Sequence, residues 1–326
     1  MSGLIFGASR AFRRLIETSD EYAKTPWPVL ILGETGVGKE LLARRIHEKS
    51  ASHRAPFVAV NCGAIPPTLF ESELFGYERG AFSGALQNYR GLIRSAQGGT
   101  LFLDEVGELD LLAQVKLLRW LDHGEVRSLG SLKSDRVHTR LVAATNVDLA
   151  TAVAQGRFRL DLFERLNVLT LHVPPLRDRA EDIELIARGF FAQHAREFEE
   201  HALPVLKRFH WPGNVRQLRN VLLRAVARCQ DRICDALLER LLEEERAFAQ
   251  ALLENQNPSL QDSSLADIEK RVIIDRIRKC HGNKKRAAEE LGIAKSTLHE
   301  KIRRWNEASA LDFDDGVGLG MVRQSS

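Results

Sequence analysis

The chain has 326 residues, of which 44% are hydrophobic and 28% charged, the composition of a globular protein of about two domains. No apolar run approaches the roughly 18 residues that span a bilayer, the N-terminus lacks the pattern of a signal peptide, and the four cysteines lack the spacing of a zinc or redox site. The net charge is +3. These features exclude a membrane-spanning or disulfide-stapled protein, so we expect a cytoplasmic one without a membrane partner.

Short apolar runs alternate with helical patterns in the first half of the chain. The runs are residues 29–32, 57–60, 101–103 and 141–144, and the patterns between them include residues 40–49 and 112–121. Buried strands that alternate with helices form a parallel sheet with helices on both faces. We therefore predict an α/β fold for residues 1–178.

The second half has helical patterns only. Residues 179–254 are predicted to form a helical subdomain, and residues 255–264 are polar, contain Pro258 and indicate a linker. Residues 265–305 form a last helical block with 12 Lys and Arg against 6 Asp and Glu, and residues 306–326 are predicted to be disordered. A basic module on a neutral-to-acidic body favours an enzyme with a nucleic-acid-binding appendage, although a solvated charged helix has the same charge.

A glycine-rich turn follows the first predicted strand and precedes a helix. Its residues are Gly33, Glu34, Thr35, Gly36, Val37, Gly38 and Lys39. Glycines let backbone N–H groups surround phosphate oxygens, and Lys39 can reach the outer phosphates, so we predict an ATP site. Glu40 stands where Ser or Thr usually contacts magnesium, which would leave the metal to nucleotide, water and the next motif.

That next motif is an apolar strand ending in Asp104 and Glu105. This placement predicts that Asp104 holds Mg²⁺ and that Glu105 polarises the attacking water. Two acids could also simply solvate a sheet edge, but the phosphate loop favours the catalytic interpretation. Asn146 ends the following strand and could sense the γ-phosphate.

Residues 73–85 carry a family resemblance. Their sequence, ELFGYERGAFSGA, closely resembles the signature insertion of sigma-54-dependent enhancer-binding proteins, a branch of the AAA+ ATPases, and further matching segments are residues 6–9, 61–62, 114–119, 174–179 and 211–216. The resemblance covers almost the whole chain, and Glu40 is usual in this family. It implies an AAA+ fold with a helical lid and a function in remodelling sigma-54 RNA polymerase. It also implies assembly into a ring, a hexamer made of this chain alone or of this chain together with a related one.

The resemblance also implies roles for single residues. Asn61 would hold Glu105 until the nucleotide state changes, and Arg216 would be a sensor in the lid. Arg159 and Arg165 would reach the ATP of the neighbouring subunit, where positive charge accelerates phosphoryl transfer. Without the resemblance, surface salt bridges would be the preferred interpretation of these arginines.

The insertion implies a contact with sigma-54. The contact residues would be Gly80, Ala81, Phe82, Ser83, Gly84 and Ala85. Phe82 is one large apolar side chain among small residues, which is typical of an exposed loop that meets a partner. Ser83 replaces the usual Thr, and Arg94 stands where a Glu is usual. The family often has a sensor domain ahead of the ATPase, so control is expected from a separate protein, from expression level or from a segment not included here.

The basic block has the pattern of a helix-turn-helix. Gly292 would supply the turn, and the block resembles the Fis-type module that binds enhancer DNA in this family. The residues expected to face DNA are Lys295, Ser296, Thr297, His299 and Lys301, with Arg303 and Arg304 near phosphates. A helical hairpin that binds protein is the alternative for this module.

Two other functions are compatible with the same parts. One is a DNA-binding AAA+ regulator that does not act on sigma-54, which the intact Phe82 loop argues against. The other is a general AAA+ remodelling enzyme such as a chaperone or helicase, which the helix-turn-helix argues against.

Overall fold

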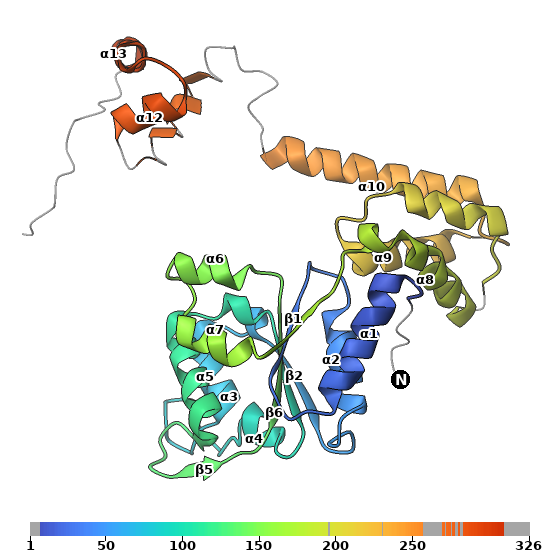
Figure 1. The fold of residues 1–326 in the computed structure, drawn as a ribbon, viewed down its shortest axis with the longest axis vertical. Coiled ribbons are helices and arrows are strands. Elements are labelled where there is room, and N and C mark those ends of the chain that lie inside the picture. The colour runs from blue at the N-terminus through green and yellow to red at the C-terminus, as the bar shows by residue number, and fades with distance from the viewer. Residues whose placement is uncertain are drawn as a thin grey trace, which may run out of the picture. The chain divides into compact units, whose positions relative to one another are not determined.

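A computed structural model describes residues 7–256 except Ala195 and Gln230, and residues 269–309 except 271, 275, 278, 279, 281 and 282. The chain divides into two compact units, Met1–Arg246 and Ala247–Ser326, which are described separately (Figure 1). Within the described part of the chain, none of the helices combines the length and the apolar character that crossing a membrane requires.

The first unit is built on a five-stranded parallel sheet in the order β2-β3-β6-β1-β7. The strands are β1 (Val29–Leu32), β2 (Phe57–Asn61), β3 (Thr100–Asp104), β6 (Arg140–Thr145) and β7 (Leu169–His172). Because all strands are parallel, their carboxyl ends share one edge, where Leu32 pairs with Thr145 and Asn61 with Asp104. This edge therefore collects the ends of four predicted strands.

Helices cover both faces of the sheet, as Figure 1 shows. On one face, α1 (Arg10–Ala23) and α2 (Lys39–Glu48) pack over a core that includes Phe12, Ile46 and Phe102. The other face carries α3 (Pro67–Phe75), α4 (Leu92–Ser95), α5 (Leu111–His123), α6 (Leu149–Ala154) and α7 (Leu160–Leu166). The predicted parallel sheet flanked by helices is confirmed.

The sequence did not predict three of the strands. β7 is a four-residue edge strand of mixed polarity, Leu-Thr-Leu-His, and it has a neighbour on one side only. β4 (Glu125–Arg127) and β5 (Ser134–Arg136) form a separate antiparallel pair, and only Val126 among their six residues is buried. Such short, largely polar strands lack the apolar run that identifies a buried one.

The rest of the first unit is helical. It contains α8 (Ala180–Gln193), the 3-10 segment η4 (Glu200–Arg208), α9 (Asn214–Arg228) and most of α10 (Asp235–Gln256). Their shared core surrounds Trp211 and Phe191, both fully buried. Three shorter 3-10 segments lie before it: η1 (Cys62–Ala64), η2 (Val106–Glu108) and η3 (Leu176–Arg179).

The second unit contains the predicted helix-turn-helix. α12 (Lys284–Glu290) and α13 (Lys295–Ser309) are joined by a turn in which Gly292 has φ +67°. Ala287, Ala288 and Leu298 are buried together, so the two helices pack against each other. α10 and α13 extend into the segments predicted as linker and tail. The remainder of both, residues 257–264 and 310–326, lies outside the described residues.

Candidate functional site

The phosphate loop joins β1 to α2 at the carboxyl edge of the sheet. Gly36 and Gly38 have φ of +80° and +103°, a backbone region that favours glycine. The Lys39 side chain is 9% exposed, and its Nζ donates to the carbonyl oxygens of Gly33 at 2.8 Å and Glu34 at 3.1 Å. The lysine thus folds back over its own loop, in the arrangement that positions an ammonium against bound phosphate.

The acidic pair lies beside this loop at the end of β3. Burial raises the pKa of the Asp104 carboxyl and lowers the pKa of the Lys39 ammonium, and each charge partly offsets the effect on the other. Glu105 has φ +57°, an uncommon conformation for a non-glycine residue, and its N–H donates to Asp104 Oδ1 at 3.1 Å. A half-buried carboxylate facing a phosphate loop is a donor set that suits Mg²⁺.

Asn61 lies next to this pair on β2. A Cβ added at Gly63 would lie 2.7 Å from Glu105 Oε2 and 3.5 Å from Asn61 Oδ1, so both side chains face the same small residue. Asn61 Oδ1 accepts a hydrogen bond from the Ala64 N–H at 3.1 Å, and no hydrogen bond joins Asn61 to Glu105 among the described residues. The control of Glu105 by Asn61 stays a prediction.

Asn146 reaches the loop from the other side. Its Nδ2 donates to Thr35 Oγ1 at 3.1 Å, and the Gly33 N–H donates to the Thr145 carbonyl at 3.3 Å. A cavity of about 570 Å³ opens beside these residues at the ends of β1, β6 and β7. The structure therefore brings Asn146 to the phosphate loop, as a γ-phosphate sensor requires.

The helical subdomain also contacts the loop, through residues that the sequence did not single out. Arg177 forms a bidentate ion pair with Glu34, and the Asn214 amide donates to Glu34 at 3.0 Å and to the Thr35 carbonyl at 3.1 Å. Hydrogen bonds from Arg177 and Asn214 lower the pKa of the Glu34 carboxyl to about 2. Both partners fall in segments that carry the family resemblance, which was the only signal for them.

A small apolar cavity of about 70 Å³ lies on the far side of the loop. It is lined by side chains from α1, the loop, α2 and the helical subdomain, among them Phe12, Val37, Leu42, Ile186 and Val215. An apolar slot next to a phosphate loop can take the base of a nucleotide. No sequence pattern indicated it, because ordinary core residues from segments far apart in the chain form it.

The three arginines with implied roles are surface residues. Arg159 forms an ion pair with Asp161 at 2.7 Å, and Arg165 forms one with Asp122 at 2.6 Å, with side chains 42% and 58% exposed. Both lie at the ends of α7. Arg216 is exposed, and its backbone N–H donates to the Gly36 carbonyl at 3.2 Å, which places it beside the phosphate loop.

The Phe82 loop is held closed at its base. Tyr77 and Tyr89 exchange two backbone hydrogen bonds of 2.8 and 2.9 Å, and the Gly80 N–H donates to the Ala85 carbonyl at 2.9 Å. Phe82 is 41% exposed and packs edge-on against Tyr77 with 5.0 Å between ring centroids. Gly80, Ser83 and Gly84 are exposed and Ala81 is half-buried, whereas Ala85 is buried in this conformation.

Arg94 joins the base of this loop to the β4–β5 pair. Its guanidinium donates to the carbonyls of Phe75 at 2.6 Å and Val126 at 2.8 Å and to Ser128 Oγ at 3.0 Å. It also forms an ion pair with Asp135 at 3.0 Å, and its side chain is only 11% exposed. The departure from the usual Glu is therefore accommodated by a set of acceptors suited to an arginine.

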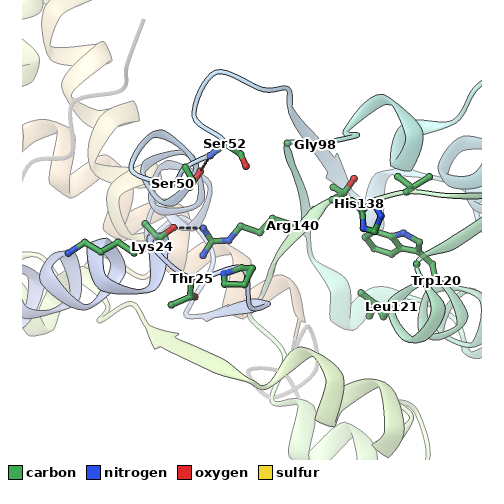
Figure 2. Close-up of a pocket in the computed structure, with 16 residues that line it drawn as sticks. Lys24, Thr25, Ser50, Ser52, Gly98, Trp120, Leu121, His138 and Arg140 are labelled. Atoms are coloured by element: carbon green, nitrogen blue, oxygen red, sulfur yellow. Dashed lines mark hydrogen bonds between the residues drawn. The ribbon is translucent and has the colours of Figure 1, made fainter.

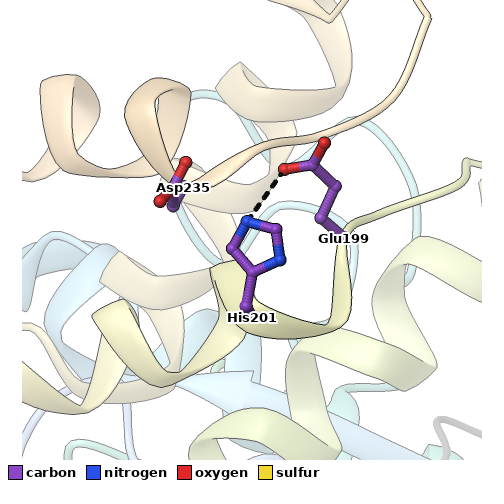
Figure 3. Close-up of side chains that lie close together, drawn as sticks. All are labelled: Glu199, His201 and Asp235. Atoms are coloured by element: carbon purple, nitrogen blue, oxygen red, sulfur yellow. Dashed lines mark ion pairs between the residues drawn. The ribbon is translucent and has the colours of Figure 1, made fainter.

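One other group of side chains has the composition of a metal site. Glu199, His201 and Asp235 place their donor atoms within 4.8 Å of one another in the helical subdomain (Figure 3). His201 forms an ion pair with Glu199 at 3.3 Å and is 69% exposed. Glu199 and Asp235 are half-buried and only His201 is exposed, but Mg²⁺ prefers oxygen ligands to a histidine nitrogen. Asp104 beside the phosphate loop is therefore the better candidate for holding magnesium.

In the second unit, the predicted DNA-contacting residues fall on α13. Lys295, Ser296 and His299 are exposed, Thr297 is half-buried, and Lys301 forms an ion pair with Glu269 at 2.8 Å. Arg303 is exposed, and the side chain of Arg304 lies outside the described residues. Leu298 is buried, so the opposite face of α13 packs into the core of this module. The exposed residues therefore form a surface that can enter a DNA groove.

Comparison with known proteins agrees with this arrangement. Residues 5–172 match the sigma-54 interaction domain, residues 177–253 the AAA+ ATPase lid domain, and residues 264–305 the Fis family of bacterial regulatory proteins. The chain is 40% identical to the transcriptional regulatory protein XylR of Pseudomonas putida, over 91% of this chain and 56% of XylR. It is also 40% identical to the DNA-binding transcriptional regulator NtrC of Rhizobium meliloti, over 92% of this chain and 69% of NtrC.

Among solved structures, NtrX from Brucella abortus in complex with ATP is similar with a TM-score of 0.67 and 34% identity, covering 93% of this chain and 69% of NtrX. The fold and the site thus define a P-loop ATPase of the AAA+ class with a helical lid. The chain belongs to the family of sigma-54-dependent transcriptional regulators, which confirms the resemblance carried by residues 73–85. It spans 56% of the length of XylR.

Proposed function

We propose that this chain is an ATP-driven activator that binds upstream DNA, assembles into a ring and remodels sigma-54 RNA polymerase from the closed to the open complex. The observation that carries the proposal is the exposed Phe82 loop, which lies in the chain between the phosphate loop and the Asp104–Glu105 pair. Family membership supports sigma-54 as the partner of this loop.

The ATPase part of the proposal rests on the contents of the site. The loop amides and Lys39 would bind the phosphates, and Asp104 would hold Mg²⁺, which neutralises phosphate charge when bound. Glu105 orients and deprotonates water, and Asn146 contacts the outer phosphate. The similar NtrX structure contains ATP, which supports the choice of nucleotide.

The polypeptide chain connects the Phe82 loop directly to the strand that carries the catalytic pair, so hydrolysis could move the loop. The chain leaves the Phe82 loop at Tyr89, forms α4 and then enters β3, which ends in Asp104. At the loop base, a Cβ on Gly76 would lie 2.3 Å from the Tyr89 carbonyl, so the two ends of the loop are in close contact. A shift of β3 relative to α3 would therefore move the loop as one body.

Ring assembly is proposed because Arg159 and Arg165 lie on the surface, where they can complete a neighbour's site. An arginine supplied in trans makes hydrolysis depend on assembly. Specific ATPase activity should rise with protein concentration, and a mixture of Arg165→Ala and Glu105→Ala subunits should recover part of the lost turnover. Flat specific activity across the range from monomer to oligomer would contradict a shared site.

The function as a whole is tested by transcription from purified components. The chain, ATP, sigma-54 RNA polymerase and a promoter with upstream sites should give open complexes, and a non-hydrolysable ATP analogue should give none. Open complexes with the main sigma factor but not with sigma-54 would support the alternative regulator instead. ATP-dependent unfolding of an unrelated protein without promoter activation would support a general remodelling enzyme.

A further inference from the structure

Gln114 on α5 is a polar residue that is fully buried. The other buried residues of this helix are Ala113, Leu117 and Trp120, so Gln114 stands on the core-facing side, where an apolar side chain is usual. Burying an amide is unfavourable unless its hydrogen bonds are made. The partners of the Gln114 side chain therefore explain its place in the core.

The side-chain amide of Gln114 joins two other segments of the chain to α5. Its Nε2 donates to the carbonyl oxygens of Leu109 at 2.8 Å and Arg157 at 3.1 Å, and its Oε1 accepts from the Arg159 N–H at 2.8 Å. Both amide hydrogens and the amide oxygen are used, and two carbonyl partners with one N–H partner fix the orientation of the amide. Gln114 thus holds residues 157–159 against the turn that precedes α5.

The turn that contains Leu109 comes directly from the catalytic pair. η2 begins one residue after Glu105, and Leu109 follows its last residue. A Cβ added at Gly107 would lie 2.8 Å from Thr145 Oγ1, so η2 is packed closely against the end of β6, next to Asn146. A closely packed segment transmits displacements of its neighbours. A shift of Glu105 or Asn146 with the state of the nucleotide would therefore reach Leu109.

The other segment carries an arginine assigned to the neighbouring site. Arg159 is the N-cap residue of α7, and Phe158 before it is buried, so Phe158 and Gln114 together fix the backbone here. The Arg159 side chain is 42% exposed and forms an ion pair with Asp161, whose side chain is 46% exposed. Ion pairs between exposed groups are weak, so the guanidinium can leave Asp161 for a stronger partner. The reach of the guanidinium then depends on the backbone that Gln114 holds.

We propose that Gln114 is a positioning residue that sets the place of Arg159 according to the state of its own subunit's nucleotide site. The inference rests on the proposed function, in which Arg159 completes the site of the neighbouring subunit. A shift of η2 moves Leu109, turns the Gln114 amide and displaces the Arg159 backbone, which carries the guanidinium toward or away from the neighbour's phosphate. Because phosphoryl transfer depends on accurately placed positive charge, the nucleotide state of one subunit then controls the rate of hydrolysis in the next.

The test mixes wild-type subunits with an excess of carrier subunits whose own sites do not turn over ATP. Glu105→Gln makes such a carrier, and it still presents its Arg159 to the wild-type site beside it. Carriers that also have Gln114→Met keep a side chain of similar shape but lose its three hydrogen bonds. We expect these carriers to lower ATP turnover per wild-type subunit by roughly tenfold or more, relative to Glu105→Gln carriers. Carriers with Arg159→Ala and Glu105→Gln give the level for complete loss of the arginine.

The reverse mixture separates a positioning role from a purely structural one. Here the active subunits have Gln114→Met, and the excess carriers have only Glu105→Gln, so the active sites receive a correctly placed Arg159. ATP turnover per active subunit should fall several-fold less than in the first mixture. General damage to the fold by Gln114→Met would lower turnover equally in both mixtures, and that result would overturn the proposal.

The matched control is Gln97→Met in carriers that have Glu105→Gln. The Gln97 side chain also accepts a hydrogen bond from a distant backbone N–H, that of His138 at 3.1 Å. This contact lies at the amino edge of the sheet, where Gly98 and His138 line a separate cavity of about 640 Å³ (Figure 2). Gln97→Met carriers should therefore behave as Glu105→Gln carriers do.

Thermal midpoints and sedimentation check that the variants fold and assemble. If Gln114→Met does not fold, Gln114→Asn takes its place, because its amide is one methylene too short to reach both segments. If carriers with Arg159→Ala lower turnover and carriers with Gln114→Met do not, this inference alone fails. If neither carrier lowers turnover, Arg159 does not act on a neighbour, and the proposed shared site fails together with this inference.

Discussion

Glu34 in the phosphate loop and Arg177 at the start of the lid form a bidentate ion pair with oxygen–nitrogen distances of 2.5 and 2.8 Å. Asn214, from a second lid segment, donates to the same carboxylate. Asn214 itself has φ +53° and is fully buried, so the lid backbone is shaped to bring it there. The loop that would bind phosphate is therefore joined to the lid by an ion pair and a hydrogen bond.

Arg177→Gln should weaken the contact between the phosphate loop and the lid. The lid would close less well over the nucleotide, so we expect the KM for ATP to rise by roughly three- to tenfold with a smaller change in kcat. Arg188→Gln is the matched control, because Arg188 also pairs with a glutamate, Glu200, on the lid surface. Steady-state ATPase kinetics measure KM and kcat of both variants. Equal KM values would show that the Glu34 contact has no role in ATP binding.

The same pair predicts a pH dependence of stability. The pKa of Glu34 is lowered from 4.5 to about 2, so the ionised carboxylate stabilises the fold above about pH 4.5, and this contribution is lost as pH falls toward 2. In Arg177→Gln the pKa of the Glu34 carboxyl should return toward its ordinary value, and the loss of stability between pH 4.5 and 2 should be smaller. Urea denaturation of the wild-type chain and of Arg177→Gln between these pH values measures the free energy of unfolding. If this free energy fell equally with pH in both proteins, the Arg177 contact would not be the cause of the lowered pKa of Glu34.

Arg94→Ala should destabilise the first unit. It removes a donor from the Val126 carbonyl, leaves the Phe75 carbonyl with only the Ser128 hydroxyl at 3.3 Å, and leaves Asp135 without its partner. We expect these losses to cost about 2–4 kcal/mol. Arg79→Ala, on an exposed residue of the Phe82 loop, is the control. The free energy of unfolding from urea titration gives the answer, and a loss no larger than that of the control would show that the Arg94 contacts are dispensable.

Substitutions of Lys39 and Glu105 should separate nucleotide binding from ATP turnover. Lys39→Ala removes the buried ammonium and should impair nucleotide binding, whereas Glu105→Gln keeps the shape of the site and should bind ATP normally. Turnover should fall by about 10²–10⁴ in Glu105→Gln, the range for loss of a general base. Glu108→Gln, an exposed neighbour, serves as control. Undiminished hydrolysis in Glu105→Gln would remove that residue from the mechanism.

Deletion of residues 257–326 should abolish site-specific DNA binding and leave the ATPase intact. In the full chain, Lys295→Gln should weaken binding to all sequences and reduce the salt slope by about one. Lys49→Gln, on an exposed lysine at the end of α2, should change neither. Fluorescence anisotropy at several salt concentrations provides the measurement. Equal DNA binding by the shortened chain would place the contact elsewhere.

Local patterns accounted for much of this architecture. Four apolar runs predicted four of the five strands of the parallel sheet, since buried parallel strands are nearly continuously apolar, and Gly292 marked the turn between α12 and α13. Strand order at the carboxyl edge then explains why Lys39, Asp104 and Asn146 meet. The family resemblance placed Arg216 beside the loop, which spacing alone could not do.

The remaining features depend on contacts between distant segments. The Glu34–Arg177 pair joins residues 143 positions apart, and either side chain alone resembles an ordinary surface charge. Arg94 was noticed only as a departure from the usual Glu, and its five acceptors come from four segments. The hydrogen bonds of Gln114 have no sequence signature, because the fold decides which backbone groups its amide meets.

The most direct test of the central claim is the rate of open-complex formation by Phe82→Ala on a sigma-54 promoter, followed by permanganate reactivity of the melted DNA. Phe248→Ala, which also truncates an exposed phenylalanine, is the control, and Ser83→Thr should be tolerated because it only adds a methyl group. ATPase activity and assembly of Phe82→Ala should stay at the wild-type level. We expect open-complex formation to fall by roughly thirtyfold or more, because an aromatic anchor at an interface is lost. Open complexes at the wild-type rate would contradict it, since the loop would then not couple hydrolysis to sigma-54.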